Sequence, residues 1–382
     1  MNLPQDRASA PAAWRATLVA WRNQLLANPR FRRWAARFPL TRPHVRREAQ
    51  ALFDLCAGFV YSQVLFACVR LRLFEQLAER PLGAEALSSR LGLSVEATHR
   101  LLDAAMALQL VERVALDCYT LGTRGAVVLA EPGIAAMVEH HAMLYRDLAE
   151  PETLLRDATA PTQIGRYWSY ARNQDARALA PQEIADYSAL MALSQPLVAE
   201  QVLAAYAFER HRCVLDVGGG EGAFLLEVAR HTRRPRLMLF DLPGVTERAR
   251  QRIDAAGFAD RIQIVPGDFF ADPLPTGADL VTMVRVIHDH DDEQALSLLR
   301  AARRCLPADG ALLLAEPMAG PDASGRASAA YFGFYLLAMR SGLPRTPQAL
   351  SNLLVESGFE PPRLLAPPVP LQARILLARV RA

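Results

Sequence analysis

The sequence contains no lysine, so all 43 of its basic residues are arginine. This absence excludes a Schiff-base lysine and the phosphate-binding lysine of a P-loop. Cysteine is also scarce: the five cysteines are widely spaced, and none belongs to a C-x-x-C pair. An odd number without such a pair favours reduced core thiols in a cytosolic protein over a disulfide framework.

Long hydrophobic runs are missing as well. No apolar signal segment opens the chain, and the longest uncharged apolar stretch, residues 55–69, is shorter than the ~20 residues that a membrane-spanning helix requires. We therefore expect a protein that does not cross a membrane. With 382 residues, 51% of them hydrophobic, the chain is long enough for two domains that each have a sizeable core.

The net charge of +3 is unevenly distributed along the chain. Residues 1–50 hold ten arginines and only two acids, whereas the remainder holds 33 arginines and 38 acids. Apolar side chains recur in this basic segment at helical spacing: Trp14, Leu18, Trp21, Leu25, Phe31, Trp34 and Phe38. We predict a basic, aromatic-rich extension over residues 1–48. Its helices either lie in a bilayer interface or brace the rest of the protein or a partner subunit.

The next segment has the element order of a winged helix. A strongly apolar helical pattern over residues 49–79 precedes two short helices, at 82–91 and 94–103, and a hairpin at 111–121. The second short helix carries Arg100 as its only arginine, although a DNA-recognition helix is usually more basic. We therefore expect a structural winged-helix domain over residues 49–200 and no nucleic-acid partner. A DNA-binding regulator with a vestigial cofactor domain is the alternative.

Further helices are expected over residues 125–210. They are predicted to break at the prolines in this segment, Pro132, Pro151, Pro161, Pro181 and Pro196. Bulky groups such as His140, His141 and Tyr145 either pack in a core or line an apolar substrate cavity. The histidine pair has no third ligand at metal-binding spacing, so we expect no metal site.

From residue 213 onward, strands and helices alternate. This predicts an α/β fold with a mostly parallel, Rossmann-like sheet over residues 201–382 and helices on both of its faces. The predicted strands are residues 214–217, 237–240, 262–265, 280–284, 311–315 and 374–380. The last of these is expected to be antiparallel and to lie at the end of the sheet.

The first of these strands runs into a glycine cluster, Val214-Leu-Asp-Val-Gly-Gly-Gly-Glu-Gly-Ala-Phe224. A strand, a tight turn and a helix N-terminus form the usual small-molecule site of a doubly wound sheet. Glu221 lies inside the loop, where its carboxylate would repel a pyrophosphate, and Asp216 suits a cationic amino-acid moiety.

Acidic residues at the ends of the next two strands support the same ligand. Asp241, followed by Leu242, can accept both hydroxyls of a ribose, and Asp268 with Phe269 suits an adenine. A glycine turn at Gly218 and Gly220 with these acids, and without phosphate-binding groups, indicates S-adenosylmethionine rather than NAD. We also place Arg285, at the end of the fourth strand, in the cofactor-binding region.

A histidine cluster follows the fourth strand of the predicted sheet. His288 and His290 lie just past its carboxyl end, next to the cofactor cleft. A histidine there can accept the proton of a hydroxyl that attacks a sulfonium methyl group, and His288 is the better candidate. Glu316, at the end of the fifth strand, either hydrogen-bonds a histidine or simply finishes the strand. The nearby acids, Asp289, Asp291 and Asp292, either orient the ring or cap the next helix.

These motifs together resemble the dimeric small-molecule O-methyltransferases, which include plant phenolic enzymes. The arginine-rich start, His140-His-Ala-Met-Leu-Tyr145 and Val284-Arg-Val-Ile-His-Asp-His-Asp-Asp292 are similar to a narrower group, the purple-bacterial hydroxyneurosporene and demethylspheroidene O-methyltransferases. The resemblance implies a Rossmann-like methyltransferase domain preceded by an α-helical winged-helix dimerisation domain. It also implies a swapped homodimer.

The resemblance assigns roles to individual residues. It implies that Gly218, Asp241, Asp268 and Phe269 hold S-adenosylmethionine, that His288 is the base and that Glu316 is the acid beside it. The chain departs from the plant pattern at one point. Plant enzymes carry a second acid in a Lys-Glu-Arg-Thr segment, where this chain has Leu343-Pro-Arg-Thr346, so support of the base by two carboxylates is not expected.

We therefore predict an S-adenosylmethionine-dependent O-methyltransferase that acts on a hydroxylated carotenoid with His288 as general base. Methylation of another pigment, such as a ring carbon of a bacteriochlorophyll, is the enzymatic alternative. The expected location is the cytoplasm, with peripheral association at the inner or photosynthetic membrane as an open question.

Overall fold

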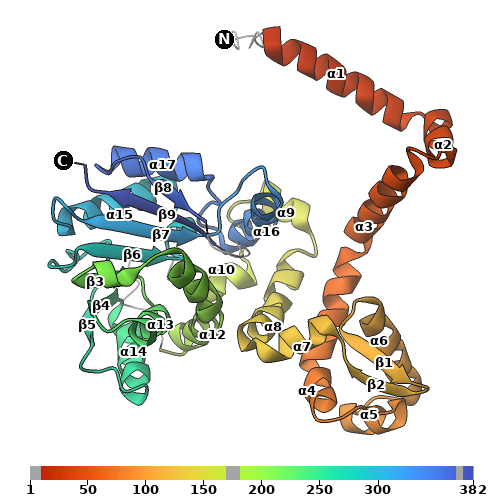
Figure 1. Ribbon diagram of the computed structural model, residues 1–382, viewed down its shortest axis with the longest axis horizontal. Helices are drawn as coiled ribbons and strands as arrows, with labels where there is room; N and C mark the ends of the chain where they lie inside the picture. The colour runs from red at the N-terminus through yellow and green to blue at the C-terminus, as the bar shows by residue number, and fades with distance from the viewer. Residues whose placement is uncertain (1–9, 169–180, 367–372, 382) are drawn as a thin grey trace.

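The computed structural model describes residues 10–168, 181–366 and 373–381 and divides into an α/β body, a smaller helical unit and an extended helical arm (Figure 1). The body holds a seven-stranded sheet in the order β5-β4-β3-β6-β7-β9-β8. Its strands are β3 Cys213–Val217, β4 Arg236–Asp241, β5 Ile262–Pro266, β6 Leu280–Val284, β7 Ala311–Glu316, β8 Arg363–Leu365 and β9 Arg374–Arg379. The predicted α/β fold and its five parallel strands are confirmed.

The end of the sheet differs from the prediction. β9 is antiparallel to β7 as expected, but β8 pairs outside it and forms the edge. β8 was missed because a strand of three residues, two of them exposed, carries no alternating hydrophobic pattern.

Alternating burial along the strands builds a core on each face of the sheet. Leu215 and Val217 pack with α15 Asp292–Cys305 and α17 Pro347–Glu356 on one face. Val214 packs on the other face. That face is covered by α12 Pro181–Ala205, α13 Ala223–His231 and α14 Pro243–Ala255. β3 pairs with β4 on one side and with β6 on the other, so the strand order reverses there. The carboxyl ends of β3 and β6 therefore border the crevice in which doubly wound sheets bind ligands.

The helical unit confirms the predicted winged helix. Its core is a single apolar cluster that includes Leu73, Phe74, Leu87, Leu102 and Tyr119. The elements are α3 Arg42–Arg70, α4 Leu73–Ala78, α5 Ala84–Leu91, α6 Val95–Ala107, β1 Val111–Ala115, β2 Cys118–Leu121, α7 Thr123–Ala130 and α8 Pro132–Asp147. α9 Pro151–Arg156 and α10 Gln163–Tyr167 follow α8 along the chain, and the 3-10 turn η2 Phe208–Arg210 joins α12 to β3 within the body.

The predicted helix break at Pro196 is wrong, because Pro196 lies inside α12. A proline removes one backbone hydrogen bond from a helix, and tertiary packing can offset that cost. Val198 and Ala199, just beyond it, are fully buried against the sheet. The burial of this stretch is what holds the helix together.

The arm consists of α1 Ala10–Ala27, α2 Pro29–Arg37 and the first half of α3, and it projects from the rest of the molecule (Figure 1). The predicted boundary after residue 48 lies inside α3. This helix has 29 residues, and an 18-residue window with a mean hydropathy of 1.8 is only 11% buried. By length and composition alone α3 could cross a membrane. This was not predicted, because the uncharged apolar stretch covers only residues 55–69. Such helices also occur in protein cores and protein interfaces.

One carboxylate joins the starts of two central strands. Asp279 precedes β6, and its oxygens accept hydrogen bonds from the backbone N–H groups of Cys213 at 2.8 Å and Arg212 at 3.0 Å. Burial would raise the pKa of Asp279, but these two backbone donors and the neighbouring His211 outweigh burial and hold it below its usual value.

We expect Asp279→Ala to lower the free energy of unfolding by about 1.5–3 kcal/mol, because two backbone N–H groups lose a charged acceptor. Urea denaturation measures this change. The exposed Asp260→Ala is the matched control and should change stability by less than about 0.5 kcal/mol. In the wild type, the contribution of Asp279 should be lost as pH falls through its lowered pKa. Equal stabilities of the two variants would contradict this role.

Candidate active site

The glycine loop after β3 presents bare backbone to the crevice. Gly218, Gly220 and Gly222 have φ angles of +69°, +58° and +78°, which side-chain-bearing residues rarely adopt. A Cβ at Gly218 would lie 2.9 Å from a methyl group of Val286, so no larger residue fits there. A Cβ at Gly220 would meet no atom within 4 Å, so the loop is open at this point. A ligand can therefore approach the backbone closely at Gly220.

Asp216 lies beneath this loop with 1% of its surface exposed. Its Oδ1 accepts a 2.6 Å hydrogen bond from the hydroxyl of Thr282, whereas its Oδ2 has no hydrogen-bond partner. Burial, only partly offset by that hydrogen bond, raises the pKa of Asp216 to about 7. An unpartnered buried carboxylate oxygen is costly, and a cationic group in the crevice would offset that cost.

Asp241 ends β4 and ties the loop to the neighbouring strand. Its Oδ2 accepts from the backbone N–H of Gly220 at 2.8 Å, and its Oδ1 accepts from that of Leu242 at 2.7 Å. Burial raises the pKa of Asp241 to about 6 despite these donors. Each carboxylate oxygen keeps a second lone pair with which it can accept a ribose hydroxyl.

The third predicted ligand segment follows β5. Asp268 is buried, and its Oδ1 accepts from the backbone N–H of Phe270 at 2.9 Å. The ring of Phe269 packs edge-on against His290, with centroids 5.6 Å apart. Burial and the neighbouring His288 lower the pKa of His290 to about 4. His290 is therefore a neutral ring in an aromatic cluster, consistent with its lower rank as a base.

Two predicted residues have structural partners that the sequence did not reveal. Glu221 forms ion pairs with Arg248 at 2.7 Å and Arg252 at 3.4 Å, both from α14. Its charge is compensated, so the argument that it would repel a pyrophosphate does not hold. Arg285 has a φ of +61°, and its guanidinium donates a 2.8 Å hydrogen bond to the hydroxyl of Ser194 on α12.

Glu316, at the end of β7, organises the turn that carries His288. Its Oε1 accepts from the backbone N–H groups of Val286 at 3.0 Å and Ile287 at 2.7 Å. Its Oε2 lies 2.7 Å from Nδ1 of His288. The turn is the 3-10 helix η3 Ile287–Asp289. Of the two roles left open for Glu316, the structure shows the hydrogen bond to a histidine.

A second carboxylate contacts the other ring nitrogen of His288. Oδ1 of Asp289 lies 3.1 Å from Nε2, and both side chains are buried. Burial lowers the pKa of His288, but the charges of Asp289 and Glu316 outweigh burial and raise it above the usual value. The expectation that Pro344 leaves the histidine with one carboxylate is therefore wrong, because Asp289 supplies the second.

Arg345 braces the same turn and was missed by the sequence reading. Its buried guanidinium donates to the backbone carbonyls of Ile287 at 3.0 Å and His290 at 2.7 Å, and to Asp292 at 2.7 Å. Gly342 packs directly against the same turn, because a Cβ at this position would be 2.0 Å from the carbonyl oxygen of His288. The segment Leu343-Pro-Arg-Thr346 contains this arginine, but a single arginine in a loop gives no local sign of distant backbone partners.

A wall of aromatic rings on α16 Ala323–Met339 completes the surroundings of His288. Phe332 packs edge-on against His288, with centroids 5.8 Å apart. Its neighbours hold α8 by two hydrogen bonds, Tyr335 to His140 at 2.6 Å and Tyr331 to His141 at 2.7 Å. In the part of the chain that the structure describes, no group of three or more histidine, cysteine or acidic side chains could hold a metal ion.

Comparison with known proteins agrees with this arrangement. The O-methyltransferase domain profile matches residues 155–360, and the O-methyltransferase dimerisation domain profile matches residues 53–130. The demethylspheroidene O-methyltransferase of Cereibacter sphaeroides is 44% identical over 336 residues, which is 88% of each chain. The enzyme of that name from Rhodobacter capsulatus is 40% identical, over 87% of this chain and 83% of that protein.

A solved methyltransferase structure has the same fold. Human N-acetylserotonin methyltransferase in complex with S-adenosylmethionine superimposes with a TM-score of 0.74 at 26% identity, covering 88% of this chain and 98% of that one. The dimerisation match spans the winged helix and supports a homodimer. The open glycine loop, the unpartnered oxygen of Asp216 and the acceptor Asp241 fit a ligand that carries a cationic amino-acid end and a ribose. The chain belongs to the O-methyltransferase family and is an S-adenosylmethionine-dependent O-methyltransferase.

Proposed function

We propose that this enzyme methylates a hydroxyl group of a hydroxylated carotenoid, of the hydroxyneurosporene or demethylspheroidene type, with His288 as the general base. The 44% identity to a demethylspheroidene O-methyltransferase supports the substrate class. The 2.7 Å contact of His288 with Glu316 at the crevice supports the base, and it is the observation on which the mechanism rests.

In this proposal the residues around the glycine loop hold the methyl donor. Asp216, Gly218 and Gly220 bind its amino-acid end, Asp241 and the backbone at Leu242 bind its ribose, and Asp268 with Phe269 binds its adenine. Arg285 closes the crevice towards α12. The bound donor supplies an electrophilic methyl group on a positively charged sulfur, and a water-poor site favours the dispersal of that charge.

His288 works as a base only in its neutral form. In the neutral ring Nδ1–H donates to Glu316, which leaves the lone pair of Nε2 on the side where Asp289 now lies. A neutral imidazole has one N–H, and Asp289 beside Nε2 therefore favours the protonated ring. The substrate hydroxyl must take the place of Asp289 at Nε2, and Asp289 then stabilises the imidazolium that forms. The hydroxyl of a carotenoid of this type belongs to a tertiary alcohol, which is a very weak acid. Its proton therefore moves to Nε2 during or after carbon–oxygen bond formation.

A carotenoid substrate also bears on the apolar surroundings of His288 and on the location of the enzyme. The rings of Phe332 and Tyr331 offer an apolar wall to a polyene chain. We divide the chain into an extension over 1–48, a dimerisation domain over 49–200 and a catalytic domain over 201–382. We place the enzyme in the cytoplasm, peripherally associated with the inner or photosynthetic membrane, because carotenoids dissolve in lipid.

Purified enzyme incubated with labelled methyl donor should transfer label to a carotenoid with a free hydroxyl. It should not label the same carotenoid without that hydroxyl, because no oxygen is then available for attack. Chromatography of detergent-dispersed substrates measures the transfer. Label on a bacteriochlorophyll precursor in the same panel, and none on any carotenoid, would overturn the substrate assignment.

Asp241→Ala should weaken binding of S-adenosylmethionine by roughly 10–100-fold, because two ribose hydroxyls lose a charged acceptor worth about 1.5–3 kcal/mol. Calorimetry measures the affinity, and circular dichroism checks the fold. The exposed Asp260→Ala is again the control and should bind like the wild type. Unchanged affinity in a folded Asp241→Ala variant would show that the ribose acceptor lies elsewhere.

His288→Ala should reduce turnover by about 10²–10⁴-fold and leave donor affinity nearly intact, whereas His290→Ala should be much milder. The raised pKa of His288 predicts a rate that rises with pH until His288 loses its proton. Asp289→Asn removes one of the two charges that raise this pKa, so the rise should move to lower pH. A rise that stays in place, or a His290 variant with the larger loss, would show that the base is misassigned.

A further inference from the structure

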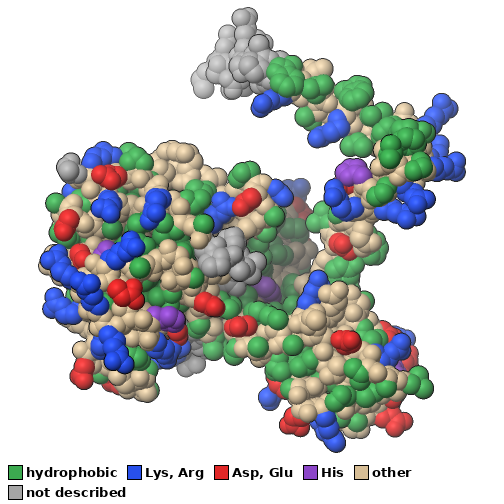
Figure 2. All heavy atoms as spheres, viewed as in Figure 1, with side chains coloured by type: hydrophobic (Ala, Val, Ile, Leu, Met, Phe, Trp, Pro, Cys, Tyr) green, Lys and Arg blue, Asp and Glu red, His purple; other side chains and the backbone are tan. Residues whose placement is uncertain are grey.

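Packing within the part of the chain that the structure describes does not explain the composition of the arm. From residue 14 to residue 53 nearly every side chain of α1, α2 and the start of α3 is exposed. The exposed side chains include large aromatic groups, with Trp14 54%, Trp21 62% and Trp34 52% exposed. Figure 2 shows basic and hydrophobic groups interleaved along this arm. An apolar surface of this kind on isolated helices requires a partner.

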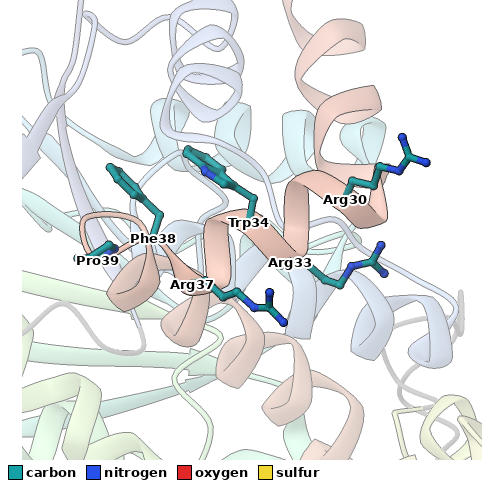
Figure 3. A pocket seen from close by; sticks show the side chains of 6 residues that line it. All are labelled: Arg30, Arg33, Trp34, Arg37, Phe38 and Pro39. Atoms are coloured by element: carbon teal, nitrogen blue, oxygen red, sulfur yellow. The ribbon is translucent and has the colours of Figure 1, made fainter.

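α2 separates its two kinds of side chain onto different faces. Arg30, Arg33 and Arg37 recur at helical spacing along one side of α2. Trp34 and the C-cap Phe38 lie on the neighbouring side, so that both sets line one surface pocket (Figure 3). The aromatic rings pack on one another, with centroids 5.6 Å apart for Phe31 and Trp34 and 5.1 Å apart for Trp34 and Phe38. We call the two faces the arginine stripe and the aromatic stripe. The helix thus pairs a row of cations with a row of rings.

α1 and α2 contain no acidic residue, whereas in the first half of α3 Arg47 pairs with Glu48 at 3.3 Å. Between Asp6 and Glu48 the chain has ten arginines and no aspartate or glutamate, although acids outnumber arginines in the remainder. A solvated helix face usually interleaves both signs, because salt bridges along the helix are favourable. The partner of the arginine stripe is therefore anionic.

A second copy of the chain fits a different part of this arm. On the next stretch of α3, residues 49–69, Asp54 is the only charged side chain, and Leu52, Phe53, Leu55 and Phe59 are 60–79% exposed. Such an apolar, nearly uncharged face suits a protein partner. The match to the dimerisation domain begins within it, at residue 53. α1 and α2 precede both domain matches. The composition therefore changes where the shared dimerisation domain begins.

We propose that α1 and α2 dock the enzyme on an anionic lipid bilayer, with the arginine stripe at the phosphate head groups and the aromatic stripe at the acyl boundary. Tryptophan and phenylalanine beside arginine on one helix are typical of such interfacial segments. The inference rests on the proposed function, because an enzyme for a carotenoid must reach a substrate that is dissolved in lipid. It assigns that contact to α1 and α2 and not to the apolar face of α3.

Sedimentation of the full-length enzyme with vesicles tests the proposal. The wild type should bind vesicles that contain phosphatidylglycerol far better than pure phosphatidylcholine vesicles, and binding should weaken as salt screens the charges. The variant with Arg30→Gln, Arg33→Gln and Arg37→Gln should bind about 100-fold more weakly, since each arginine near such a surface contributes roughly a fivefold factor. Its matched control changes three exposed arginines of the body, Arg233→Gln, Arg234→Gln and Arg236→Gln, and should bind like the wild type.

A second variant, Trp34→Ser with Phe38→Ser, tests the aromatic stripe and should bind roughly tenfold more weakly at every salt concentration. Light scattering should show the wild-type oligomer for all variants. Three results would overturn the proposal: an equal loss of vesicle binding in the control variant, no loss of vesicle binding in the arginine variant, or dissociation of the arginine variant into monomers. Activity on detergent-dispersed carotenoid separates the two hypotheses. If the wild type binds vesicles but does not methylate the carotenoid, the proposed function alone is refuted. If the wild type methylates the carotenoid but does not bind vesicles, the docking alone is refuted.

Discussion

The buried carboxylate of Glu316 is the interaction on which the candidate active site depends. It accepts two backbone N–H groups of the turn after β6 and lies 2.7 Å from Nδ1 of His288. A charge that is 99% buried is tolerable only when donors surround it, and here they come from a single turn. The requirement to satisfy Glu316 therefore fixes both the backbone path of η3 and the direction of the His288 ring. Arg345 closes the turn from the other side through two of its carbonyls.

The same arrangement sets opposing demands on the histidine. Burial disfavours a charged imidazole, while Asp289 and Glu316 on its two nitrogens favour one. A base must start neutral but must also hold a proton once the hydroxyl loses it. Glu316, at Nδ1, can accept a hydrogen bond from both the neutral and the protonated ring, whereas Asp289, at Nε2, can accept one only from the protonated ring. In the proposed mechanism Asp289, 3.1 Å from Nε2, stands where the substrate oxygen enters, and it is the group that the substrate displaces.

The sequence was informative wherever function and local backbone coincide. The strand before the glycine loop, the tight turn at Gly218 and Gly220 and the position of His288 after a strand follow from composition and order along the chain. Apart from Glu316 beside His288, partners from distant segments were not predicted. The ion pairs of Glu221 with α14 and the reach of Arg345 back to η3 depend on how helices pack, which no local pattern encodes. Pro196 shows the same limit, because packing on the sheet overrides the local tendency to end a helix.

α3 also links the arm to the catalytic crevice. The first half of α3 belongs to the arm, and its second half packs on α8, where Phe66 meets Tyr145 at a centroid distance of 5.9 Å. α8 in turn holds α16 through the pairs of His140 with Tyr335 and His141 with Tyr331. Phe332, between those two tyrosines, lies against His288. In the proposed docking, α3 connects the lipid-bound helices α1 and α2, across the turn at residues 38–41, to the crevice and so couples the orientation of the crevice to the bilayer. For a substrate that is dissolved in a bilayer, this orientation matters as much as affinity.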